Sequence, residues 1–171
     1  MKTTPKAKID PVALAKYLLV KMGSTDHLKL QKLLYYVEAW HLVFFDSPII
    51  EEDFRAWVHG PVLLSVWHDL KKLSILHGEV QIKKAFRERN VQAVTNKLDQ
   101  DQLELIDDVL KEYGSKSGYH LECLTHAEAP WRSARAGLAP DEPGSRKISK
   151  KLMKSFYRDR LQANGQEAQS A

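Results

Sequence analysis

The chain has 171 residues, of which 43% are hydrophobic and 28% are charged, and its formal net charge at pH 7 is +4. This composition predicts one domain with a buried core, which excludes intrinsic disorder over most of the chain, and we find no apolar run long enough to span a membrane. A single cysteine, Cys123, excludes a disulfide scaffold and a thiolate-rich zinc site. We expect a cytoplasmic protein with no metal ion and no cofactor.

Two helices are predicted first, after a flexible N-terminus over residues 1–9. The first helix begins after Asp10, which suits the N-cap, and ends at Gly23. The second covers about residues 28–45 and is apolar around nearly its whole circumference. Since a helix of this kind is surrounded by other elements, we take it as the central helix of the fold.

The following elements are shorter and less regular. Residues 49–58 fit either one small hairpin or an extended connection, and Pro61 is expected to open a helix that ends at Leu73. Residues 74–97 show no steady period. Further helices are expected over residues 99–113, 117–126 and 149–161, with a turn near 130–137 and a loop over 137–145.

These elements predict a mainly α fold. It is a single-domain helical bundle over residues 10–161, built around the buried central helix, with at most one small β-hairpin near residues 49–58. The polar residues 162–171 are expected to form a disordered tail.

A search for catalytic and metal-binding patterns assigns no residue. The chain has no phosphate-binding glycine loop and no H-E-x-x-H motif. Residues 114–118 resemble a nucleophile elbow, but Lys116 stands where serine is needed. His120, Cys123 and His126 are spaced so that the outer two diverge by roughly 120° around a helix, and no fourth ligand is evident. We therefore expect no catalytic residues and no metal ligands.

Positive charge is concentrated near the C-terminus. The residues that carry it are Arg146, Lys147, Lys150, Lys151, Lys154, Arg158 and Arg160. They fit a patch for an anionic partner, or the solvated face of a helix whose other face packs on the core. Because no recognition-helix pattern and no ladder of aromatic residues accompanies them, we expect no nucleic-acid partner.

Two polar residues stand out inside the apolar central helix. Gln31 and Lys32 lie in the stretch Leu30 to Tyr36, where polar groups must be paired or must reach the surface. One interpretation is structural, with Gln31 bonded to nearby backbone and Lys32 extended to solvent. The other is that both contact a partner.

Three motifs together resemble the Panacea domain, which defines the SocA-like antitoxin family associated with phage and mobile elements. They are L-x-K-L-L-Y-Y at residues 30–36, A-W-x-x-G-P-V at 56–62 and T-H-x-x-x-P-W at 125–131, and the resemblance covers about residues 10–160. It implies a helical antitoxin, not an enzyme, that binds and neutralises a protein toxin encoded beside it.

The resemblance also implies which partners to consider. The founding member acts as an adaptor that delivers its toxin to an AAA+ protease, so proteolytic delivery is the alternative to direct neutralisation, with a nucleic-acid-binding module as a third hypothesis. The motifs offer partner-binding candidates, and Trp57 and Trp131 among them fit a core position as well as an interface. The candidates are Gln31, Lys32, Trp57, His59, Trp131 and Arg132.

Overall fold

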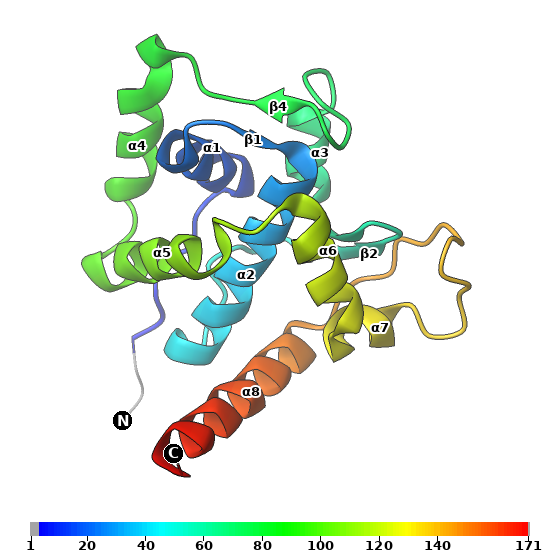
Figure 1. Ribbon diagram of the computed structural model, residues 1–171. Helices are drawn as coiled ribbons and strands as arrows, with labels where there is room; N and C mark the ends of the chain where they lie inside the picture. The colour runs from blue at the N-terminus through cyan, green and yellow to red at the C-terminus, as the bar shows by residue number, and fades with distance from the viewer. Residues whose placement is uncertain (1–3, 171) are drawn as a thin grey trace.

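The computed structural model describes residues 4–170, and over these residues it contains eight α-helices and two small antiparallel sheets (Figure 1). The helices are α1 (Pro11–Met22), α2 (His27–Phe45), α3 (Leu64–Leu70), α4 (Arg87–Thr95), α5 (Gln100–Tyr113), α6 (Gly118–Ala127), α7 (Ala129–Ala134) and α8 (Lys150–Ser170). The strands are β1 (Thr25–Asp26), β2 (Arg55–Trp57), β3 (Gly60–Val62) and β4 (Glu79–Val80). The prediction of a mainly α fold is confirmed.

Helix α2 is the centre of the molecule. It packs against α1, α5, α6 and α8, which surround it in Figure 1. Most of its side chains are buried, and among its charged and polar ones only Lys29 is half-buried, as the nearly all-round apolar surface of the sequence predicts. The Asp26 carboxylate caps it by accepting a 2.7 Å hydrogen bond from the Lys29 N–H.

Helix α8 docks on α2 through aromatic side chains. Tyr157 and Met153 are buried, and the Tyr157 ring meets Tyr35 and Tyr36 edge to face. On its other side Tyr36 stacks on Tyr113 of α5, with the ring centroids 4.0 Å apart. These contacts join α5 and α8 to the central helix α2.

The hairpin lies slightly further along the chain than expected. Strands β2 and β3 pair at residues 55–62, and Pro61, which we expected to begin a helix, lies in β3 opposite Ala56. The turn is possible because residue 60 is a glycine: its φ is +100°, a backbone angle that residues with a side chain rarely adopt. A second pairing, between β1 and β4, arises in part from residues 74–97, where no period was evident.

Near both ends, the described residues make contacts or form helix. Within the flexible N-terminus expected over residues 1–9, Ile9 is buried and its N–H donates to the Ile49 carbonyl at 2.9 Å, while residues 1–3 lie outside the described part. At the other end, α8 continues as exposed helix through residues 162–170, which we expected to be a polar tail.

Candidate functional site

The three sequence motifs meet at the buried side chain of Lys32. Its exposed fraction is 0%, and its Nζ donates a 3.0 Å hydrogen bond to the carbonyl of Pro61. A Cβ added to Gly60 would lie 2.5 Å from Lys32 Cε and 3.0 Å from Thr125 Oγ1. Glycine is thus required at position 60 for two reasons: its backbone has a positive φ, and the side chains of Lys32 and Thr125 leave no room for a Cβ.

Burial changes the acidity of this amine. Removal from water lowers the pKa of Lys32 from 10.5 to about 7, although the negative charges of Glu122 and Asp26 act to raise it. The side chain therefore does not reach solvent, as one interpretation of the sequence supposed. The Lys32 amine holds the hairpin against α2 through its hydrogen bond to the Pro61 carbonyl.

Gln31 makes a matching contact one residue earlier. Its Oε1 accepts a hydrogen bond from the Leu63 N–H at 2.9 Å, and its Nε2 donates one to the Leu63 carbonyl at 3.3 Å. The side-chain amide thus pairs with both backbone groups of Leu63, as a neighbouring β-strand would. Gln31 Nε2 also lies 3.2 Å from His27 Nε2, and His27 Nδ1 lies 2.8 Å from the Ser74 carbonyl. Burial lowers the pKa of His27, which fits a neutral ring donating to Ser74 and accepting from Gln31.

The third motif holds the other strand of the hairpin. Trp131 is 8% exposed, and its Nε1 donates to the Trp57 carbonyl at 2.9 Å. The ring of His126 stacks on one face of Trp131 with centroids 3.9 Å apart, and the Arg135 guanidinium lies 5.2 Å from the Trp131 centroid. Arg135, which the sequence did not single out, also donates to the Ala56 carbonyl at 3.1 Å. Trp131 is therefore a core residue behind the hairpin.

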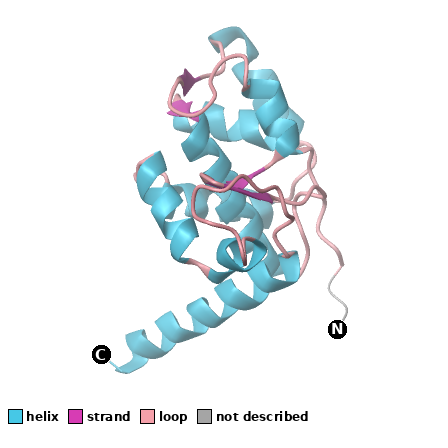
Figure 2. Ribbon diagram, turned by 90° about the vertical axis from the view of Figure 1, so that its right-hand side faces the viewer, coloured by secondary structure: helices cyan, strands magenta, loops and turns pink. Residues whose placement is uncertain are grey.

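A cleft of about 610 Å³ opens beside this cluster. Four separate segments line it: the first part of α2, the hairpin, α3 with the loop that follows it, and residues 143–145. Figure 2 shows the molecule from the side that carries the hairpin and the long loop before α8. The lining residues are His27, Leu28, Gln31, Lys32, Trp57, Val58, His59, Val62, Trp67, Ile75, Leu76, Pro143, Gly144 and Ser145.

Two tryptophans form the most prominent wall of the cleft. Trp57 and Trp67 meet edge to face with centroids 5.4 Å apart, and both are half-buried. Trp57 Nε1 donates to Ser145 Oγ at 3.1 Å, which ties the loop before α8 to the hairpin. His59 is exposed at the turn of the hairpin, where its Nδ1 lies 3.0 Å from Glu122 Oε1.

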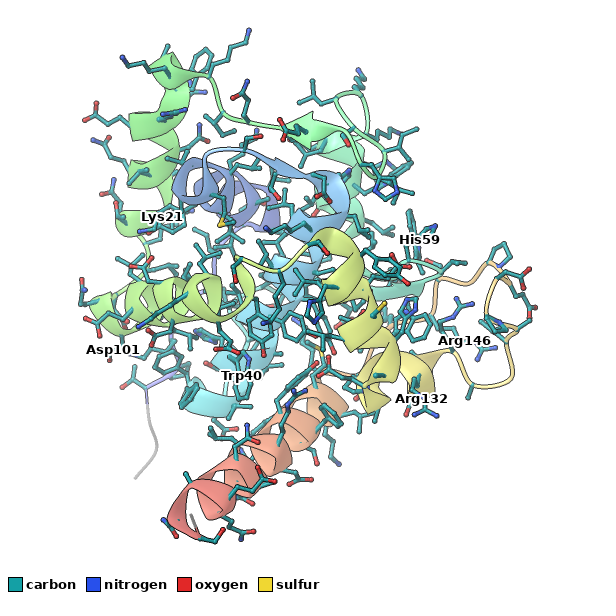
Figure 3. The ribbon with its side chains drawn as sticks, viewed as in Figure 1. Lys21, Trp40, His59, Asp101, Arg132 and Arg146 are labelled. Atoms are coloured by element: carbon teal, nitrogen blue, oxygen red, sulfur yellow. The ribbon has the colours of Figure 1, made fainter. Side chains whose placement is uncertain are left out.

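The structure thus brings four of the six partner-binding candidates to one cleft. Gln31 and Lys32 are buried in its floor, while Trp57 and His59 have exposed surface in its wall and at its edge. Arg132 is exposed on α7 and does not line the cleft (Figure 3). The sequence reasoning missed Trp67 and Ile75, for which the available signal was large apolar residues within and after a short helix.

Most of the basic cluster near the C-terminus bonds within the chain. Lys150 Nζ lies 3.0 Å from the buried Glu38 carboxylate. Burial raises the pKa of Glu38 above its ordinary value, although the charge of Lys150 acts to lower it. The other internal contacts are Lys147 with Asp53 (3.1 Å), Lys154 with Asp46, Arg160 with Glu128 (3.0 Å), and Arg146 with the Ala136 carbonyl (2.7 Å). Lys151 and Arg158 are exposed. The bonded cations therefore hold α8 and the loop before it against the rest of the protein.

Two further findings concern metal ions and membranes. Between residues 4 and 170, no group of three or more His, Cys, Asp or Glu side chains is arranged to hold a metal ion. In the same part of the chain, no helix has the length and apolar character that crossing a bilayer requires.

Comparison with known proteins identifies the family. The family described as "Antitoxin SocA-like, Panacea domain" matches residues 30–132, which include all three motifs and more than half of the chain. The chain therefore belongs to this antitoxin family. It is similar to Antitoxin SocA of Caulobacter vibrioides (strain NA1000 / CB15N), with 29% identity over 165 residues that cover 91% of this chain and 86% of the relative. No solved structure matches the chain.

Proposed function

We propose that this protein is an antitoxin that binds a protein toxin directly and blocks it, without a catalytic step of its own. The observation that carries the proposal is the cleft, whose half-buried tryptophans stand beside the aliphatic side chain of Ile75, which is 66% exposed. Interfaces draw most of their binding energy from a few aromatic and large side chains that a partner covers. Membership of the antitoxin family supplies the kind of partner.

The bonding beneath the cleft suits binding rather than chemistry. Gln31, His27 and Lys32 each direct a polar atom to a backbone carbonyl, so these groups support the hairpin and its neighbouring loop. A wall held in this way changes little in conformation when a partner arrives, which reduces the entropy lost on binding. The buried motif residues Gln31 and Lys32 therefore keep the walls of the cleft in the shape that binds the partner.

Co-expression tests the proposal. The product of the reading frame next to this gene is expressed from an inducible promoter, with and without the present chain, and growth is followed. We expect arrest that the chain relieves, and a stable complex of the two purified proteins in titration calorimetry. A neighbouring product that arrests growth but neither binds this chain nor is relieved by it would contradict the proposal.

A proteolytic adaptor is the second candidate, because α8 offers a separate surface. Residues 161–170 are exposed throughout, and in Figure 1 this end of α8 extends beyond the other helices. An AAA+ protease could bind there while the toxin occupies the cleft. The half-life of the toxin distinguishes the two mechanisms: an adaptor shortens it, whereas direct neutralisation leaves it unchanged or lengthens it.

A further inference from the structure

The wall of the cleft formed by residues 143–145 differs from the other walls in how it is held. It belongs to residues 136–145, a loop between α7 and α8 that extends away from the helices in Figure 1 and that we call the strap. The structure describes the whole strap, and none of its residues is buried. Its half-buried leucine, Leu138, does not pack against the apolar core. The strap is therefore held in place by polar contacts.

Both ends of the strap are anchored close together. Just after the strap, the backbone pairs with the residues of β2 and those before it, since the Ala56 N–H donates to the Arg146 carbonyl at 2.9 Å and the Ile148 N–H to the Phe54 carbonyl at 2.8 Å. At the start of the strap, the Ala136 carbonyl accepts a hydrogen bond of 2.7 Å from Arg146 Nη1. The strap is thus a loop with fixed ends.

The middle of the strap is held by one buried cation. Arg135 is 4% exposed, and its Nη2 donates to the carbonyls of Ala139 at 3.1 Å and of Glu142 at 2.6 Å. Its Nη1 donates to the Ala56 carbonyl at 3.1 Å, and its guanidinium lies 5.2 Å from the ring centroid of Trp131. A single guanidinium therefore joins the turn at residues 139–142 to β2.

Beside the cleft, the strap is fastened to the hairpin at one residue. Ser145 Oγ accepts a hydrogen bond from Trp57 Nε1 at 3.1 Å, and the Ser145 carbonyl accepts one from Arg55 Nη1 at 3.2 Å. Because Ser145 is exposed, water can replace both bonds when they break. Breaking them would release residues 143–145 from the wall of the cleft.

We propose that the strap opens and closes as one unit, fastened at Ser145 and supported by Arg135. Segments with few buried apolar contacts open at a free energy far below that of global unfolding. In the open state the cleft loses the wall formed by residues 143–145, and Trp57 Nε1 becomes free to donate to a bound partner. This inference concerns the chain alone and does not depend on the proposed antitoxin function.

Amide hydrogen exchange of the free protein, followed residue by residue by NMR, tests the proposal. Ser145→Ala removes the hydroxyl that accepts from Trp57. If the strap opens as a unit, the N–H groups of Leu138, Ala139 and Glu142, which are bonded at the other end of the strap, should exchange roughly two- to tenfold faster, as the loss of one hydrogen bond predicts. Arg135→Lys keeps the charge but cannot reach three carbonyls, so it should accelerate the same amides more strongly.

A matched control and an internal reference accompany these variants. Ser133→Ala makes the same change at an exposed serine of α7 and should leave exchange in the strap unchanged. The Ala56 N–H, whose acceptor is the anchored Arg146 carbonyl, should exchange at the wild-type rate in Ser145→Ala, and the melting temperature should stay near that of the wild type.

Three results would contradict the proposal. Unchanged exchange of the three strap amides in Ser145→Ala would show that the strap does not open as a unit. Equal acceleration of the Ala56 N–H and of α2 would show that it opens only when the whole protein unfolds. Wild-type exchange in the strap of folded Arg135→Lys would refute the role of Arg135.

Discussion

Replacing Lys32 with methionine should change how the stability of the protein depends on pH. The substitution keeps the length of the side chain and removes the amine, which is 0% exposed and has a pKa lowered from 10.5 to about 7 by burial. Between these two pH values the unfolded chain binds a proton at residue 32 that the folded chain has released. The free energy of unfolding of the wild type therefore rises with pH across this window.

The size of the effect follows from the shift. One pKa unit corresponds to about 1.4 kcal/mol, and a single released proton gives a rise of about 2–3 kcal/mol in the free energy of unfolding between pH 7 and pH 9. The variant lacks this contribution. It also loses the hydrogen bond to the Pro61 carbonyl, which costs about 0.5–1.5 kcal/mol at every pH and so does not alter the slope.

Urea unfolding of both proteins at pH 7, 8 and 9 measures the difference. Other titrating groups are common to the two proteins, so they cancel when the curves are subtracted. We expect the wild type to gain stability relative to Lys32→Met as the pH rises. A difference that stays constant across this range would refute the argument, since Lys32 would then hold its proton in the folded state.

Three further predictions follow from the same cluster and its surroundings. Gly60→Ala should destabilise the protein by about 1–3 kcal/mol or more in urea unfolding, because the residue has φ +100° and its Cβ would meet Lys32; a neutral result would mean that the turn relaxes freely. Trp131→Ala should cost about 3–5 kcal/mol and lower the melting temperature, whereas a stable variant that loses only toxin binding would make Trp131 an interface residue. Dialysis against EDTA should leave the melting temperature unchanged, and a large drop would reveal a structural metal ion.

The sequence predicted the centre of the fold well because the signal there is local. The segment 28–45 is apolar around nearly its whole circumference, and such a helix has to be enclosed wherever the rest of the chain goes. The cap at Asp10 is equally local, since its carboxylate accepts a hydrogen bond from the Ala13 N–H three residues later. Predictions of this kind need no knowledge of distant residues.

The hairpin and the cleft depend on contacts that local patterns do not contain. Pro61 suits the first turn of a helix, but its carbonyl accepts from Lys32 and the next residues are held by Gln31, so tertiary bonds override the local preference. In the wall of the cleft, Trp57 donates a hydrogen bond to Ser145, which is far from it along the chain. Gln31, Lys32, Trp57 and His59 could be grouped as candidates from the motifs alone, but their division into floor and wall required the structure.

Hydrogen–deuterium exchange of the chain, alone and in complex with the toxin, tests the central claim most directly. The account predicts slower exchange in three of the four segments that line the cleft, residues 57–67, 75–76 and 143–145, with little change on the outer face of α5. Protection confined to α5 or to the end of α8, with the cleft segments exchanging as in the free protein, would contradict it.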